Sequence, residues 1–311
     1  MFCSNKGIAL LTILTTAKPF VGQIRVSQIN ALKSWKAISP DVEIILFGDG
    51  VGYSQIAQEL GLIWIENVET SEQGTPTVNS MFSLARQYGR FPIQMYVNCD
   101  IIILDHLPTV LERMPADRFL MIGQRWDLDC EFEIQFEDPR WKQLLEHTVQ
   151  ERATLHPPAG SDYFIYKGDI WKDIPDLIIG RAGYDNQLIY HCRANRIPVI
   201  DASQVLRVIH QNHDYGHHPE GLTGVWYGAE AQANRVHIPD AFIFTLVDAD
   251  WQVTRKGMLK SYARGDWFRY LRATQVLRHK RWDGYLLQGL FRFLNLISRA
   301  KSKVMRLILY E

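Results

Sequence analysis

The stretch Gln94-Met-Tyr-Val-Asn-Cys-Asp-Ile-Ile-Ile-Leu104 is an apolar run that two oxygen-bearing side chains interrupt. Asn98 and Asp100 are expected on one side of an extended chain, because alternate residues of a strand point to the same face. Amide and carboxylate oxygens suit hard cations such as Mg²⁺ or Mn²⁺, so the stretch predicts a cation site at a strand end. The alternative is an ordinary strand end, with a solvated Asn98 and an Asp100 that caps the next turn.

Apolar runs alternate with amphipathic segments around this stretch, which is typical of helices that cross over a mostly parallel sheet. The sequence therefore predicts an α/β fold with a Rossmann-type sheet flanked by helices. In the first half, strands are expected at 8–15, 42–47, 62–65 and 95–104, and helices at 23–37, 55–60 and 78–88. In the second half, strands are expected at 119–128, after Asp162, at 198–201 and at 205–209, and helices at 140–149 and from Asp185 or Asn186.

Polar residues follow several of these strands. Thr15 and Lys18 lie in the turn after the first strand, Asp49 follows the second, and Asn98 and Asp100 lie in the fourth. Ligands of open α/β sheets bind at the carboxyl ends of the strands, so these side chains are expected to converge on one site. Each also has a local interpretation, since Lys18 can be solvated and Asp49 can belong to a simple glycine turn.

The overall composition excludes some functional classes. The 34 basic and 34 acidic residues balance, so the net charge indicates no nucleic-acid partner. The four cysteines show no paired spacing, which predicts neither a zinc ribbon nor a disulfide framework and favours a cytoplasmic location. The apolar run at 8–14 is too short to span a membrane and is expected to be the first core strand.

Beyond about residue 255 the composition shifts to arginine and lysine mixed with aromatic residues and leucine. We expect residues 1–250 to form the main domain and residues 251–311 a basic, amphipathic, helical extension. Within the extension, 285–310 combines apolar residues with arginine and lysine at helical spacing. Such a helix either lies at an anionic membrane surface or packs on the domain, and packing is the favoured alternative.

The order of these features over about residues 8–218 resembles the glycosyltransferases of the GT-A fold. The shared features are a nucleotide-binding α/β half, an acidic metal motif after the fourth strand, a helix that opens near an aspartate, and a late histidine. The metal motif of that family is usually Asp-x-Asp, whereas this chain has Asn98-Cys99-Asp100 and so keeps one certain carboxylate.

The resemblance implies a divalent cation, Mn²⁺ or Mg²⁺, held by Asp100, Asn98 and His210, with His213 as an alternative to His210. It also implies that Thr15 and Asp49 contact the nucleoside of a nucleotide-sugar donor. Asn186 follows Asp185 in the segment that would reach the sugar and the acceptor. The acceptor would be a glycan, a lipid or a protein.

The residue types also suit this chemistry on their own. Cleavage of a sugar nucleotide leaves a diphosphate, whose developing charge Lys18 or Arg125 can stabilise together with the cation. For inversion, Asp185 or Asp162 would take the proton of the acceptor hydroxyl. For retention, the same carboxylate would flank the anomeric carbon instead, and the sequence leaves both outcomes open.

Other interpretations stay open at this point. Asp185 and Asp162 can be helix or turn caps, and Trp226, in an expected 221–228 loop, can be either a core residue or an acceptor platform. A zinc site is an alternative use of a histidine cluster, which comprises His210, His213, His217 and His218. The competing functions are a nucleotidyltransferase, although 15–22 lacks the glycine-rich phosphate loop of that class, and a catalytically silent nucleotide-sugar-binding protein.

Overall fold

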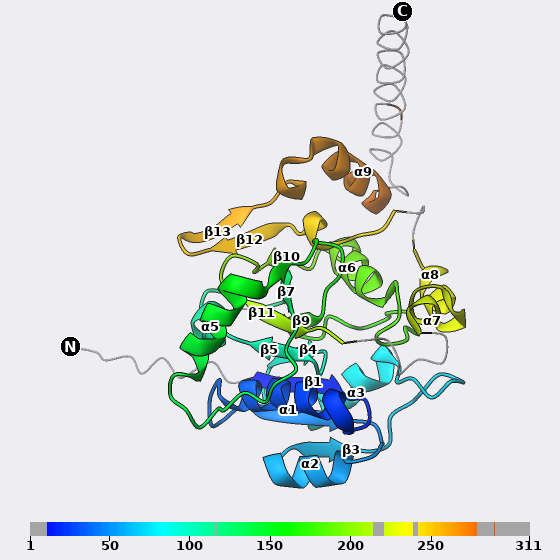
Figure 1. The fold of residues 1–311 in the computed structure, drawn as a ribbon. Coiled ribbons are helices and arrows are strands. Elements are labelled where there is room, and N and C mark those ends of the chain that lie inside the picture. Colours follow the sequence, from blue (N-terminus) through cyan, green and yellow to red (C-terminus); the bar gives the residue numbers. More distant parts are fainter. Residues whose placement is uncertain (1–10, 116, 214–220, 239–241, 279–288, 290–311) are drawn as a thin grey trace, which may run out of the picture.

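The computed structural model describes residues 11–115, 117–213, 221–238, 242–278 and 289 (Figure 1). Its centre is a nine-stranded sheet in which every strand except β9 and β13 runs in the same direction. The predicted α/β class and the mostly parallel sheet are therefore confirmed. In spatial order the strands are β3 (Ile63–Ile65), β2 (Glu43–Phe47), β1 (Leu11–Thr16), β4 (Ile93–Val97), β9 (Tyr163–Lys167), β6 (Phe119–Ile122), β10 (Val199–Asp201), β12 (Trp251–Thr254) and β13 (Gly257–Lys260).

Both faces of the central sheet are buried, because successive residues of each strand belong to different cores. Ile13 packs in one core and Leu14 in the other, and Ile44 and Ile45 divide in the same way. One core receives helices α1 (Gly22–Lys36), α2 (Tyr53–Leu60) and α4 (Leu107–Leu111). The other receives α3 (Val78–Tyr88), α6 (Tyr184–Ala194), the short helix η2 (Leu246–Asp248) and α9 (Trp267–Leu277).

A smaller sheet lies beside the central one and has its own apolar cluster. The elements of this layer are β5 (Ile101–Ile103), β11 (Val208–Gln211), β7 (Arg125–Leu128), β8 (Thr154–Leu155) and α5 (Trp141–Arg152). Strand β11 is antiparallel to β5 and parallel to β7, and β8 pairs with β7. Helix α5 packs on this sheet through Trp141, Leu145 and Val149.

The prediction of one continuous strand over 95–104 is wrong. The chain turns at Asn98, whose carbonyl accepts a hydrogen bond from the Ile101 amide at 3.1 Å. Strands β4 and β5 consequently lie in different sheets. Asn98 and Asp100 therefore belong to a turn between two sheets, not to one face of an extended strand. The predicted strand over 119–128 is divided in the same way, into β6 and β7.

Several predicted boundaries also move. Helix α6 begins at Tyr184 after Gly183, so Asp185 lies in its first turn and is not its N-cap. Trp226 lies in helix α7 (Gly221–Tyr227), not in a loop, and α8 (Ala229–Arg235) follows it.

Residues 251–278 are the main part of the predicted 251–311 extension that the structure describes, and they extend the main fold. Strand β12 pairs with β10, β13 returns beside it, and α9 follows η3 (Ala263–Gly265). Figure 1 shows this hairpin and α9 at the opposite end of the molecule from β3 and α2. The division at residue 250 stays a prediction, and the expected helix at 285–310 lies outside the described residues apart from Gly289. Among the described helices, none combines the length and the hydropathy that a membrane span requires.

Candidate active site

Asp100 lies in the turn between β4 and β5, where it faces two histidines. Its Oδ2 is 3.1 Å from Nε2 of His213 and 3.8 Å from Nε2 of His210. Its Oδ1 is buried and has no hydrogen-bond partner among the described residues. An oxygen in this position lacks the compensation that buried polar atoms normally have, so the turn presents an unused ligand atom.

His210 is oriented by the register of β11. This strand places His210 beside Ile101 of β5 and beside Asp127 of β7. Nδ1 of His210 lies 3.5 Å from Asp127 Oδ1 and 3.2 Å from Asn212 Oδ1. A proton on Nδ1 can be donated to these oxygens, which leaves the lone pair of Nε2 directed toward Asp100. A carboxylate behind a histidine is the usual support of a metal ligand.

His213 connects the same carboxylate to Lys18, which follows β1. Its Nε2 lies 3.1 Å from Lys18 Nζ and 3.1 Å from Asp100 Oδ2. One imidazole nitrogen accepts or donates a hydrogen bond but does not do both in a single protonation state. The two contacts therefore compete, and a cation between Asp100 and the imidazoles would remove the competition.

The donor set fits a divalent metal ion. Asp100, His210 and His213 offer ligand atoms that all lie within 4.8 Å of one another. Two imidazoles and one carboxylate suit Mn²⁺ or another first-row ion better than Mg²⁺, which prefers oxygen ligands. The alternative zinc cluster also includes His217 and His218, which lie outside the described residues.

Charge pairing changes the acid–base behaviour of this cluster. Burial alone would raise the pKa of Asp100, but His210, His213 and Lys18 outweigh it and hold that pKa well below its ordinary value. Burial would likewise lower the pKa of His210, yet Asp100 and Asp127 raise it above the ordinary value. The carboxylate is therefore ionised and available to a cation at neutral pH.

A second group of charges borders the metal-ligand cluster. Arg125 donates from Nε to Asp127 at 2.8 Å and from Nη1 to Asp162 at 2.6 Å. Asp162 also accepts from the side-chain amide of Asn98 at 2.9 Å. Asp127 additionally contacts Nδ1 of His156 at 2.7 Å. Arg125 is thus neutralised by two carboxylates, and both oxygens of Asp162 are occupied.

Asp185 lies at the N-terminal end of α6, close to this group. Its Oδ2 accepts a hydrogen bond from the Ser161 amide at 3.4 Å. Burial, reinforced by the negative charge of Asp162, raises the pKa of Asp185 to about 7. A carboxyl group with this pKa can exchange a proton near neutrality, which is what a general base requires.

Three predicted residues make hydrogen bonds outside the cluster. Thr15 is fully buried and its hydroxyl donates to the Val97 carbonyl at 2.8 Å, so its side chain joins β1 to β4. The Asn186 amide donates to the Phe244 carbonyl at 2.8 Å. Asp49 is exposed after β2 and accepts from the Gly50 amide at 2.7 Å.

Other predicted residues do come together, and the structure adds new ones. Lys18, Asp100 and His210 belong to the metal-ligand cluster, and Asn98, Arg125 and Asp162 border it. The amide oxygen of Asn98, predicted as a metal ligand, accepts from the Tyr96 hydroxyl at 2.8 Å. Asp127 and His156 carry no motif in the sequence that marks them as members of this group. Only the alternation of Arg125 and Asp127 within a strand could have suggested that their side chains share a face.

Comparisons with known proteins found similarity only in structure. No protein-family profile matches the chain, and no curated protein matches it. Glycosyltransferases are among the solved structures that the fold resembles. A mannosyltransferase from Pyrobaculum calidifontis, in complex with GDP-Man and Mn²⁺, is 9% identical, with a TM-score of 0.42 over 67% of this chain and 58% of that one. The chain thus spans less than two thirds of that protein.

Two further structures are similar at the same level. A glucosyl-3-phosphoglycerate synthase from M. tuberculosis is 13% identical, with a TM-score of 0.43 over 75% of this chain and 82% of that one. A structure described as a mycobacterial protein is also 13% identical, with a TM-score of 0.39 over 67% of this chain and 68% of that one. These similarities concern the arrangement of sheet and helices alone.

Proposed function

We propose that this protein is a glycosyltransferase that uses a divalent cation to transfer a sugar from a nucleoside-diphosphate donor to a hydroxyl acceptor. One observation carries the proposal: Asp100, with an unpartnered buried oxygen, faces His210 and His213 immediately after the central strand β4. This is the edge of an α/β sheet at which ligands bind.

Asp100, His210 and His213 would hold the cation, and we propose Mn²⁺ because their donor set suits a first-row divalent ion better than Mg²⁺. A divalent cation bound there would neutralise charge on the diphosphate leaving group. We assign Asn98 to the support of Asp162, because its amide already contacts Tyr96 and Asp162.

Lys18 is the cation best placed for the diphosphate. Its ammonium group reaches His213 beside the ligand atoms. Arg125 is held by Asp127 and Asp162, so we assign it to positioning these carboxylates. Two carboxylates cancel much of the field that Arg125 would otherwise offer to a phosphate.

Asp185 is our candidate for the general base. As the acceptor oxygen bonds to the anomeric carbon, the bond from that carbon to the diphosphate oxygen breaks and its electron pair leaves with the diphosphate. The hydroxyl proton would pass to Asp185, whose pKa of about 7 leaves it partly ionised at neutral pH. Asp162 is the weaker candidate, since Arg125 and Asn98 occupy its oxygens. If the enzyme retains configuration, Asp185 would flank the anomeric carbon instead.

The first experiment measures nucleotide binding. UDP, GDP and CMP would be titrated calorimetrically against the protein with Mn²⁺ and after chelation. We expect one nucleoside diphosphate to bind in a Mn²⁺-dependent manner, and equal affinity after chelation would refute the role of the cation. A mass-spectrometric screen of nucleotide sugars with glycan, lipid and protein acceptors would then identify the transfer.

The screen also separates the competing functions. A nucleotidyltransferase would release pyrophosphate from a nucleoside triphosphate and a sugar phosphate. A silent binding protein would bind a nucleotide sugar without turnover at any Mn²⁺ concentration.

The cytoplasmic location, and contact of 285–310 with a membrane surface, remain proposals from the sequence that fractionation of the expressed protein would test.

A further inference from the structure

A pocket of about 650 Å³ lies on the far side of β7 from the metal-ligand cluster. Arg125 and Asp127 point toward the cluster, and Trp126 between them points into the pocket, as alternation along a strand requires. Leu155, opposite Trp126 on β8, lines the same pocket. The volume lies within the range of about 300–1,000 Å³ that is usual for small-molecule sites.

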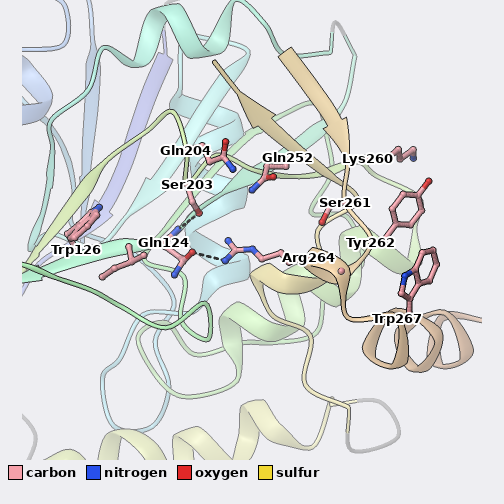
Figure 2. A pocket seen from close by; sticks show the side chains of 12 residues that line it. Gln124, Trp126, Ser203, Gln204, Gln252, Lys260, Ser261, Tyr262, Arg264 and Trp267 are labelled. Carbon is pink, nitrogen blue, oxygen red and sulfur yellow. Dashed lines mark hydrogen bonds between the residues drawn. The ribbon is translucent and has the colours of Figure 1, made fainter. Parts of the chain in front are cut away.

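The pocket combines aromatic rings with amide and hydroxyl groups and with two cations, Lys260 and Arg264. Arg264 pairs with Asp201 at 2.7 Å, and the Lys260 ammonium lies 3.9 Å from the centroid of the Trp251 ring. Figure 2 shows Trp126 at one end and Tyr262 with Trp267 at the other. The polar groups lie between these ends, and no carboxylate is among the residues that line the pocket. Rings at the ends and amide or hydroxyl groups between them match a sugar, which has C–H groups on its faces and hydroxyls at its edge. The polar lining includes Gln124, Gln252, Ser203 and Ser261.

The aromatic end is arranged before any ligand arrives. Tyr262 and Trp267 stack with ring centroids 5.5 Å apart and planes 20° apart. Tyr270 supports both rings edge-on. Tyr262 is nevertheless 43% exposed and Trp267 60% exposed. Rigid aromatic faces left open to solvent can bind a ring with little loss of conformational entropy.

The polar wall is held by a strained segment. Ala263 and Arg264 have positive φ angles of 48° and 52°, which residues other than glycine seldom adopt. Arg264 is fixed by hydrogen bonds to Asp201 at 2.7 Å and to Gln124 at 2.8 Å. Such strain persists where surrounding contacts enforce it, and it is concentrated at ligand sites.

We infer that this pocket binds a saccharide unit of the acceptor at a distance from the point of transfer. The assignment of the ligand to the acceptor rests on the proposed function, whereas the saccharide class rests on the lining of the pocket. Gln124 connects the two sites, because its amide donates to the His156 carbonyl at 2.7 Å and His156 contacts Asp127 at 2.7 Å. A saccharide held here would contact Trp126 of β7, the strand that also carries Asp127 beside His210.

The test is saccharide binding by the whole chain without nucleotide or metal. Oligosaccharides of glucose, mannose, galactose and N-acetylglucosamine would be screened by saturation-transfer NMR, and those that bind would be titrated by calorimetry. We expect at least one to bind and Trp267→Ala to weaken it about tenfold, which is the effect of losing one aromatic contact. Tyr262→Phe should preserve most of the affinity.

Phe268→Ala is the matched control. Phe268 neighbours Trp267 in α9, is 58% exposed and does not line the pocket. Its replacement should leave saccharide affinity unchanged. The inference is overturned if no oligosaccharide binds, or if binding survives Trp267→Ala and Tyr262→Ala. Nucleotide titration of the same sample separates this failure from that of the proposed function: nucleotide binding without saccharide binding refutes the pocket alone, and the reverse refutes the transferase alone.

Discussion

Asn98 donates its side-chain amide to Asp162 Oδ1 at 2.9 Å. Asn98, which the sequence resemblance aligns with the usual second carboxylate of a GT-A metal motif, thus supports another carboxylate. An aspartate at position 98 would bring two like charges together in a largely buried site, which is costly unless a cation lies between them. The two histidines beside Asp100 offer imidazole nitrogens to a cation in its stead.

Asp100→Asn should abolish metal-linked binding. The amide keeps the shape of the carboxylate but loses the charge that faces His210 and His213. We expect Mn²⁺ affinity to fall by more than about 100-fold, beyond the usual effect of losing a supporting residue. Electron paramagnetic resonance titration of Mn²⁺ measures this directly. Asp169→Asn, at an exposed ion pair with Arg86, is the control that should bind Mn²⁺ normally.

Asp127→Asn should weaken the metal site without removing a ligand. Asp127 supports Nδ1 of His210, and the loss of its charge makes the Nε2 lone pair a poorer donor. A reduction of roughly 10-fold to 100-fold in Mn²⁺ affinity is expected. Unchanged affinity in the same resonance titration would show that Asn212 alone orients His210.

Asp185→Asn should leave donor binding intact while lowering transfer by roughly 10²–10⁴-fold, the usual contribution of a general base. The wild-type rate should rise with pH and level off above about 7, because the pKa of Asp185 is raised to about 7 and the ionised form is the base. Initial rates across this range, beside calorimetry with the donor nucleotide, test both statements. A full rate in the variant would reduce Asp185 to a structural role.

The same substitution should stabilise the protein at alkaline pH. Burial raises the pKa of Asp185 from 3.8 in the unfolded chain to about 7 in the folded protein. Below pH 3.8 the carboxyl is protonated in both the folded and the unfolded state, so it does not affect the free energy of unfolding. Between pH 3.8 and about 7 only the unfolded chain ionises, so the loss of folding stability caused by Asp185 grows with pH. The gain from Asp185→Asn should be larger at about pH 8 than at about pH 5 by on the order of 2 kcal/mol. Urea denaturation at both pH values measures it, and an equal gain at both would contradict the raised pKa.

Arg125→Met should destabilise the fold by roughly 3 kcal/mol, because it leaves Asp127 and Asp162 without their shared cation. Arg86→Met removes an ion pair whose side chains are 63% and 55% exposed, and should cost less than about 1 kcal/mol. Chemical denaturation of both variants gives the comparison. Similar losses in the two proteins would mean that Arg125 contributes no more than a surface charge.

The fold class and several residues of the candidate site can be predicted from local patterns in the sequence. Apolar strands such as 42–47 and amphipathic segments such as 23–37 carry local periodicities, and these periodicities predict parallel strands with crossover helices. Asp100, His210 and Asp185 could be selected as well, because each is a chemically suitable residue at the end of a predicted element.

How these residues come together depends on contacts between segments that are distant in the chain. The turn at Asn98 sends β5 into a second sheet, and pairing with β11 then places His210 beside both Ile101 and Asp127. This register joins segments far apart in the chain, and strands apolar on both faces contain no alternation that would specify it. Burial of Asp185 depends on the same long-range packing. Local pattern determines which residues can do the chemistry, whereas nonlocal strand pairing determines which of them share a site.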